Sequence, residues 1–219
     1  MKKYNKGDFL ENVQLMHGDC MELMQKIPSA SVDLILCDLP YGMTDCSWDI
    51  EIPPYKLWAQ YNRIIKETGV IALFGIQPFM SKVILSNAKN YRYNWYWMKN
   101  GTTGFTFSKY QPLRKIEEIA VFYQKGGQYY PQGIRKIENP KWTKGVPDRE
   151  GSIYGNSLDK KHCSRYTNFP NNVLKFNNEA SNNKKRLHPT QKPVNLLEYL
   201  IKTYTKSADD GECPTCCIG

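Results

Sequence analysis

The sequence has no apolar run long enough to cross a membrane. None of its 219 residues falls in a stretch approaching the roughly 20 apolar residues that a spanning helix needs. The first ten residues, MKKYNKGDFL, also lack the apolar centre of a signal peptide. These absences argue against a membrane or secreted protein and predict a cytoplasmic location.

Regular cysteine spacing is absent as well. The chain has seven cysteines, an odd number with no repeating interval, which argues against a disulfide framework. The pair Cys213 and Cys216 forms a lone C-x-x-C without a matching second pair, so we expect no zinc site. No internal repeat is evident, and 41% apolar content is enough for one sizeable core.

Acidic residues are scarce in one segment. Residues 127–186 contain 12 Lys and Arg against 5 Asp and Glu, whereas the rest of the chain has 18 against 16. A concentrated basic excess is typical of a surface that binds a polyanion, with nucleic acid first in line. A merely solvated surface is the alternative that charge alone leaves open.

Apolar patterning in the first half predicts alternating strands and helices. We expect strands at 12–19, 31–38 and 70–75, and helical segments from 20, over 53–69 and over 78–88. Pro54 suits the first turn of the helix at 53–69, and Gly69 suits its end. The run at 31–38 does not alternate, which indicates a strand buried on both faces of a parallel sheet. This order predicts a doubly wound α/β domain.

The second half has a different composition. Aromatic and β-branched residues predict strands at 91–99 and 117–125, and the polar interval 100–115 is predicted to be a mobile loop. Periodicity fades over 127–183, which we interpret as an inserted, loop-rich lobe closed by a strand at 171–176. A helix begins at Pro193, where Leu196, Leu200 and Tyr204 lie on one apolar stripe.

The buried strand at 31–38 ends in the sequence DLPYG. Ligands of parallel α/β sheets gather beyond the carboxyl ends of the strands, where Asp38 is expected. Its carboxylate and a backbone carbonyl of Leu39 or Pro40 can accept two N–H bonds from the exocyclic amine of a nucleobase, which frees the nitrogen lone pair for attack. Tyr41 can stack on the base. The alternative is a simple polar turn.

In its motifs the chain resembles the β group of DNA amino-methyltransferases. DLPYG resembles their D-P-P-Y signature, HGDC at 17–20 their cofactor-adenine contact, and HPTQKP at 188–193 their cofactor-binding segment. The strands at 69–75 and 117–126 also match, so the resemblance extends from Val13 to Tyr204. It implies a Rossmann-like sheet that uses S-adenosylmethionine (SAM), methylation of adenine N6 in preference to cytosine N4, and a restriction-modification context.

The resemblance also assigns residues and domains. It implies catalytic roles for Asp38, Pro40 and Tyr41, cofactor contacts for Asp19, His188, Thr190, Gln191 and Lys192, and a target base rotated out of double-stranded DNA. Lys192 and the free N–H groups of the following helix are expected to hold the cofactor carboxylate. The implied domains are a catalytic core over 1–126, a target-recognition lobe over 127–183 and a cofactor segment over 184–219. A homodimer is compatible with this organisation.

The resemblance assigns the central lobe to DNA contacts. We expect seven cations there to meet phosphates: Arg135, Lys136, Lys141, Lys144, Lys160, Lys161 and Arg165. Five aromatic residues are expected to divide between contacts to bases and a small core of the lobe: Tyr129, Tyr130, Trp142, Tyr154 and Tyr166.

Two departures from the family pattern stand out. Leu39 replaces the first proline of the signature, a minor change because Pro40 still restricts its geometry. After about Thr205 the chain reads KSADDGECPTCCIG, in place of the strand and glycine-rich turn, D-x-x-x-G-x-G, that wraps the methionine part of SAM. We therefore expect the C-terminal part of the sheet to be missing, and both SAM affinity and activity to be impaired.

The sequence is compatible with three functions. The first is the DNA amino-methyltransferase, and the second is a catalytically inactive remnant that binds nucleic acid. The third is a methyltransferase for RNA or a protein amide. The basic, aromatic lobe favours nucleic acid over a protein amide.

Overall fold

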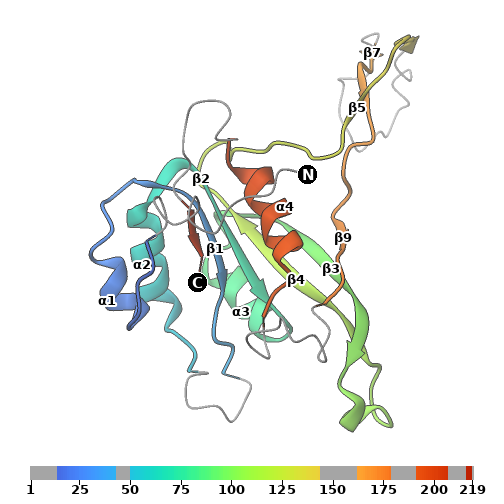
Figure 1. Cartoon of the computed structure of the whole chain (residues 1–219). Coiled ribbons are helices and arrows are strands. Elements are labelled where there is room, and N and C mark those ends of the chain that lie inside the picture. The colour runs from blue at the N-terminus through green and yellow to red at the C-terminus, as the bar shows by residue number, and fades with distance from the viewer. Residues whose placement is uncertain (1–13, 43–49, 144–161, 179–190, 207–215, 219) are drawn as a thin grey trace, which may run out of the picture.

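The molecule is built on a six-stranded sheet with helices on both faces (Figure 1). The computed structural model describes residues 14–42, 50–143, 162–178, 191–206 and 216–218. The strand order is β10-β1-β2-β4-β3-β9. Strands β10, β1 and β2 are parallel, and β4 is antiparallel to both of its neighbours. The predicted α/β fold with a mostly parallel sheet is confirmed.

Strand β1 (Val32–Asp38) lies inside the sheet. Its central residues Leu34, Ile35 and Leu36 are each at most 2% exposed, because they alternate between the two covered faces. On one side β1 pairs with β2 (Ile65–Gly75) and on the other with the short strand β10 (Cys216–Ile218). The end of the sequence therefore contributes one parallel strand next to the strand that carries Asp38.

Helix α2 (Pro54–Ile64) is shorter than predicted, and Gly69 does not end it. Ile65 already has extended backbone angles and begins β2. Gly69 lies within β2, at an irregularity in the pairing with β1, where a Cβ atom would come within 2.8 Å of Ile65 and 3.0 Å of the Asp33 carbonyl. The glycine therefore permits a close approach of the two strands. In the sequence, a glycine with this role looks the same as a glycine that ends a helix.

Strands β3 (Tyr91–Thr103) and β4 (Arg114–Phe122) form a long antiparallel hairpin. Residues 100–103 and 114–115 of the interval predicted as a mobile loop belong to these strands, and the connection between them contains a short 3-10 helix, η1 (Phe105–Phe107). The predicted bounds of the loop were too wide because local polarity says nothing about the pairing of the two strands, and its mobility stays a prediction. The hairpin projects beyond the body of the sheet (Figure 1).

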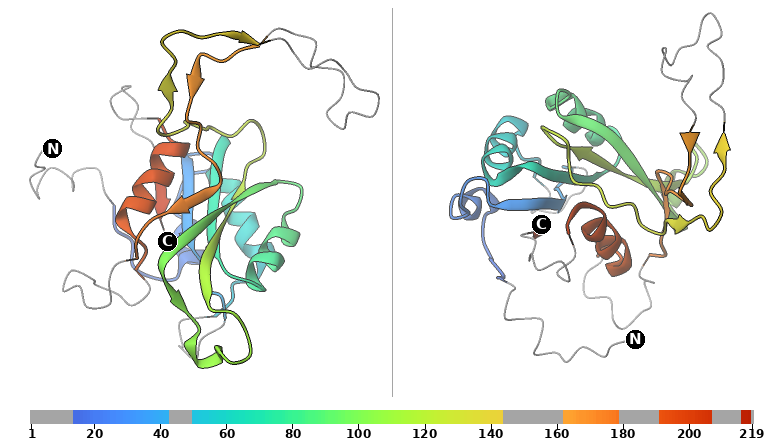
Figure 2. Two further views of the ribbon diagram at one scale, coloured as in Figure 1. Left: turned by 90° about the vertical axis from the view of Figure 1, so that its right-hand side faces the viewer. Right: turned by 90° about the horizontal axis from the view of Figure 1, so that it is seen from above.

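Helices cover the two faces unequally, as seen from above in Figure 2. Helices α1 (Cys20–Met24) and α3 (Phe79–Ser86), together with α2, pack on one face around Leu57, Trp58 and Met80. Helix α4 (Val194–Tyr204) covers the other face with its predicted apolar stripe, and Leu196 and Leu200 are fully buried. The hydroxyl of Tyr204 accepts a hydrogen bond from Trp95 Nε1, which fixes α4 against β3.

The described part of the predicted lobe is a narrow arm with little core. It contains two pairs of two-residue strands, β5 (Arg135–Lys136) with β8 (Tyr166–Thr167), and β6 (Trp142–Thr143) with β7 (His162–Cys163). The chain returns to the sheet through β9 (Val173–Lys175), which pairs with β3 as the predicted closing strand. Among the described residues of 127–183, only Leu174 is buried.

Two further predictions concern the segment before α1 and the absence of a membrane-spanning helix. Residues 14–19 are exposed and form no strand, so the strand predicted at 12–19 is wrong over this described part, where a loose alternation was a weak signal. Within the described ranges, no helix combines the length and apolar character needed to span a membrane.

Candidate active site

Asp38 lies at the carboxyl end of β1, as the sequence predicts. The apolar part of the strand is buried in the sheet, whereas the Asp38 side chain is 27% exposed. Its two oxygens have different partners. Oδ1 accepts a hydrogen bond from the Tyr41 hydroxyl at 2.5 Å, and Oδ2 lies 3.1 Å from the Lys192 ammonium. The carboxylate is therefore held in one orientation at the mouth of the sheet.

Tyr41 serves Asp38 through its hydroxyl, a role that sequence reasoning missed. Its ring packs on Phe79 from α3, with ring centroids 5.0 Å apart and planes tilted by 40°. Burial, followed by the negative charge of Asp38, raises the pKa of Tyr41 far above its usual value. The hydroxyl consequently stays protonated and acts as a donor. The Tyr41 side chain is half-buried and its ring already packs on Phe79. The stacking of this ring on a target base stays a prediction.

Lys192 is the centre of the site. Its ammonium lies 3.0 Å from Glu117 Oε2 and 3.1 Å from Asp38 Oδ2, and its side chain is only 13% exposed. The same charge sits 5.1 Å from the centre of the Phe74 ring, within the range of a cation–π interaction. Lys192 of HPTQKP and Asp38 of DLPYG therefore meet in space.

Glu117 and Lys99 complete the charged cluster, and the sequence analysis did not identify either of them. Glu117 on β4 binds Lys99 on β3 through Oε1 at 2.9 Å, and Lys99 is 7% exposed. Burial raises the pKa of Glu117, but the charges of Lys192 and Lys99 outweigh it, so the net pKa is lowered. A sequence signal did exist, since both residues stand next to apolar strand segments, where an unpaired charge would be costly.

Other predicted cofactor residues fall partly within the described chain. His188 and Thr190 lie outside the described residues, whereas Gln191 is half-buried just before Lys192. Helix α4 starts directly after Pro193 and has no side-chain cap. Its first N–H groups therefore have no acceptor within the helix and carry the positive end of the helix dipole. Because Lys192 pairs with Asp38, this helix end lies at the same edge of the sheet.

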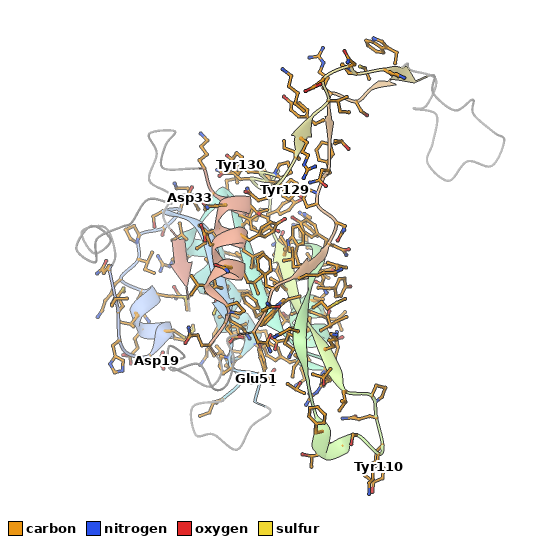
Figure 3. All side chains as sticks on the ribbon, turned by 45° about the vertical axis from the view of Figure 1, so that its right-hand side comes forward. Asp19, Asp33, Glu51, Tyr110, Tyr129 and Tyr130 are labelled. Carbon is orange, nitrogen blue, oxygen red and sulfur yellow. The ribbon has the colours of Figure 1, made fainter. Side chains whose placement is uncertain are left out.

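Asp19 caps helix α1. Its Oδ1 accepts hydrogen bonds from the backbone N–H groups of Met21 at 2.7 Å and Glu22 at 3.4 Å. Figure 3 shows Asp19 at the opposite end of the sheet from Asp33, which lies at the start of β1, so Asp19 lies toward the Asp38 end of that strand. The carboxylate thus has a structural role at the expected place, and its contact with a cofactor stays a prediction.

The predicted phosphate contacts stand apart from Asp38. Lys144, Lys160 and Lys161 lie outside the described residues. The described members of the set are exposed on the arm: Arg135, Lys136, Lys141 and Arg165. Strand β4 runs from the Asp38 edge to the opposite edge of the sheet, where the arm begins. In Figure 3, Tyr129 and Tyr130 at the root of the arm lie far from Glu51 at the other end.

Among the described residues of the arm, the aromatic side chains do not form the expected small core. Trp142 is 69% exposed and Tyr166 is 46% exposed, while Tyr154 lies outside the described residues. Tyr129 instead lines a pocket of about 320 Å³ at the root of the arm, together with Tyr93 and Trp95 of β3. A two-stranded ribbon offers no second layer in which aromatic rings can be buried.

Comparison with known protein families identifies the family of the chain. A family model described as "DNA methylase", for N6 and N4 methyltransferases, matches residues 32–210. A curated relative, the type II methyltransferase M.HinfI of Haemophilus influenzae, is 34% identical over 98 residues, covering 34% of this chain and 27% of the relative. This match thus spans about a quarter of the relative's length.

Solved structures provide a likeness in fold alone, because their sequence identities are low. The M1.HpyAVI–SAM complex has a TM-score of 0.53 at 17% identity and covers 94% of this chain and 92% of its own. The PvuII DNA methyltransferase, which is cytosine-N4-specific, has a TM-score of 0.56 at 13% identity and covers 92% and 79%. Both likenesses include most of the chain, so the sheet described above is a shared architecture.

Proposed function

The chain belongs to the family of DNA methylases, and we propose that it transfers a methyl group from SAM to the exocyclic amine of a base in double-stranded DNA. Adenine N6 is the preferred target and cytosine N4 the second. The observation that carries this proposal is the Asp38 carboxylate, fixed by Tyr41 and Lys192 at the carboxyl end of β1. The target base has to leave the duplex stack to reach such a site.

Asp38 accepts a hydrogen bond from the target amine. Each carboxylate oxygen has about two acceptor positions, so the bonds to Tyr41 and Lys192 leave acceptor capacity on both oxygens. The carbonyl of Leu39 or Pro40 takes the second N–H of the amine. Together these acceptors favour a pyramidal nitrogen, whose lone pair is then directed at an electrophile.

The hydrogen-bond donors and acceptors at this edge of the sheet suit a cofactor that carries a carboxylate and an adenine. SAM supplies the electrophilic methyl group when bound. The uncapped N–H groups at the start of α4 are suited to its carboxylate, and Asp19 is suited to its adenine amine. Gln191 stands beside this helix end, and His188 and Thr190 precede it in the chain.

The role of Lys192 differs from the one first expected. Its ammonium is shared between Asp38 and Glu117, so its charge is already balanced before any cofactor carboxylate arrives. We assign it the positioning of Asp38 instead, with Glu117 and Lys99 as its support. The ammonium, 3.1 Å from Asp38 Oδ2, orients the carboxylate whose oxygens accept the hydrogen bonds.

A protein that binds nucleic acid without transferring a methyl group is the second candidate. The basic arm favours it, because its described cations stand at the edge of the sheet remote from Asp38. A methyltransferase for RNA or a protein amide uses the same acceptor chemistry. Competition of duplex DNA, RNA and peptide for methyl incorporation separates these substrates.

The test uses purified protein with radiolabelled SAM and mixed-sequence duplex DNA. We expect label to be incorporated into DNA at a low rate and calorimetry to detect weak but saturable SAM binding, because residues 206–219 contain no D-x-x-x-G-x-G turn for the methionine part of SAM. Binding of DNA without uptake of SAM would support the second candidate. Incorporation that survives the change Asp38→Ala would contradict the assignment of Asp38.

A further inference from the structure

The β3–β4 hairpin ends in a group of exposed aromatic rings. Phe105 is 66% exposed, Phe107 53% and Tyr110 86%. All three lie in residues 101–113, which we call the hairpin tip. Single exposed apolar residues are common on soluble proteins, whereas several aromatic residues in one protruding turn are typical of a contact site.

The rings are carried by a regular turn. The backbone N–H of Phe107 donates to the Gly104 carbonyl at 3.0 Å, and those of Tyr110 and Gln111 donate to the Phe107 carbonyl at 2.9 and 3.0 Å. Gly104 adopts a left-handed conformation, with φ of 93°, that permits the turn. Exposure of the rings is therefore a feature of a hydrogen-bonded hairpin end.

The charge of the hairpin tip and its base has one sign. Residues 100–116 contain Lys109, Arg114 and Lys115 but no aspartate or glutamate, and all three cations are exposed. A partner that complements both features has to be anionic and to offer flat apolar faces. Nucleic acid has both, since phosphates meet the cations and bases stack on aromatic rings.

The position of the hairpin tip links it to Asp38. In the strand register, Asp38 lies beside Phe74 of β2, and Phe74 lies beside Ile119 of β4. Strand β4 starts at the tip and passes Glu117, which shares Lys192 with Asp38. The tip therefore extends beyond the edge of the sheet that carries the candidate site. Figure 3 shows Tyr110 at this end and the arm at the opposite end.

We propose that the hairpin tip is a DNA-contacting wedge, whose aromatic rings insert against base pairs of the duplex next to the base received at Asp38. This inference rests on the proposed function and deepens it. Inserted apolar side chains unstack neighbouring bases and ease the extrusion of a nucleotide. Lys109 and Lys115 hold the phosphates on either side of the inserted rings.

The experiment compares three variants of the full chain by fluorescence anisotropy on a labelled mixed-sequence duplex over a range of NaCl concentrations. The ring variant is Phe105→Ala/Phe107→Ala/Tyr110→Ala, and the charge variant is Lys109→Gln/Lys115→Gln. The control variant, Tyr55→Ala/Leu85→Ala, removes side chains that are 73% and 76% exposed on α2 and α3. Circular dichroism and unfolding midpoints verify that each variant folds.

We expect the ring variant to bind the duplex at least about tenfold more weakly with an unchanged salt dependence, because stacking involves no counterion release. The charge variant should flatten the slope of log K against log[NaCl] by about 1.8, or roughly 0.9 per phosphate contact. The control variant should bind within about twofold of wild type, as side chains away from the contact do.

A duplex with one mismatched pair distinguishes insertion from simple surface contact. A mismatched base opens more easily, so the ring variant should recover much of its lost affinity on this duplex if the rings act as a wedge. Equal binding of the ring variant and wild type on matched DNA overturns the inference but leaves the proposed function standing. Failure of the wild type to bind any DNA overturns both.

Discussion

The Lys192 ammonium lies 3.1 Å from the Asp38 carboxylate, and this contact joins the start of α4 to the end of β1. The two residues come from opposite ends of the chain. Glu117 binds the same ammonium from β4 at 3.0 Å. One lysine thus connects three elements at the edge of the sheet to which we assign methyl transfer.

Replacement of Lys192 should damage both stability and activity. The change Lys192→Met leaves Asp38 and Glu117 as neighbouring carboxylates without their shared cation, and loss of one member of a buried ion pair costs about 3 kcal/mol. Urea unfolding measures this loss. The surface change Lys202→Met, which breaks an exposed pair with Glu198, should cost less than about 1 kcal/mol.

A positioning role for Lys192 also predicts partial rescue. Lys192→Arg keeps the charge and should retain more methyl transfer than Lys192→Met at saturating SAM, since the missing function is orientation of Asp38. If Lys192→Met raised only the Kd for SAM and left the rate at saturation unchanged, Lys192 would instead be a cofactor contact.

Glu117 should make stability depend on pH in the acid range. Burial works against its charge, but Lys192 and Lys99 lower its pKa below the ordinary value of 4.5. The unfolded chain therefore binds this proton at higher pH than the folded chain. The stabilisation is present in full above pH 4.5 and is lost as the pH falls through the lowered pKa.

Urea unfolding of wild type and Glu117→Gln between pH 6 and pH 3 measures this dependence. Wild type should be more stable at pH 6, and the difference should shrink at acid pH, where the wild-type carboxyl also becomes neutral. A matched control is Glu198→Gln, which removes an exposed carboxylate and should leave the profile nearly unchanged. A constant difference between wild type and Glu117→Gln at every pH would contradict the account.

Tyr41→Phe tests the hydroxyl of Tyr41 separately from its ring. The variant keeps the packing on Phe79 and loses the hydrogen bond to Asp38. A hydrogen bond to a charged group contributes about 1.5–3 kcal/mol, so we expect methyl transfer to fall roughly tenfold or more. Single-turnover assays measure the rate, and Tyr55→Phe on the exposed part of α2 serves as control. An unchanged rate would mean that Asp38 does not need this donor.

Asp19 has a structural role that must be separated from any contact with SAM. Asp19→Ala removes the cap of α1 and should cost about 1 kcal/mol of stability. Asp19→Ser can still cap the helix but lacks a carboxylate for the adenine amine. A weaker affinity of Asp19→Ser for SAM, with stability near that of wild type, supports the cofactor role. Equal affinities would leave Asp19 as a helix cap only.

The sequence predicted the parts of the fold that depend on local pattern. The buried strand that ends at Asp38, the start of α4 at Pro193 and the closing strand β9 were all identified, because apolar periodicity and proline act locally. The bounds of the loop predicted at 100–115 were too wide because the extent of a hairpin depends on pairing between its strands. Gly69 was misjudged because close approach of two strands is a tertiary property.

Within the candidate site, motifs located Asp38, Tyr41 and Lys192, but their contacts were not predictable from them. Nothing in DLPYG indicates that Tyr41 donates to Asp38, and nothing in HPTQKP indicates that Lys192 has two carboxylate partners. Glu117 was missed because an ion pair depends on which strands become neighbours. The arrangement of β1, β2 and β4 in the sheet supplies that information.

The most direct test of methyl transfer at Asp38 is mass spectrometry of nucleosides from duplex DNA that has been incubated with the protein and SAM. We expect N6-methyladenine as the main product for wild type, with N4-methylcytosine as the alternative, and a loss of at least about 100-fold for Asp38→Asn. A methylated amine formed equally well by Asp38→Asn, or methylation only at ring carbon, would contradict this role of Asp38.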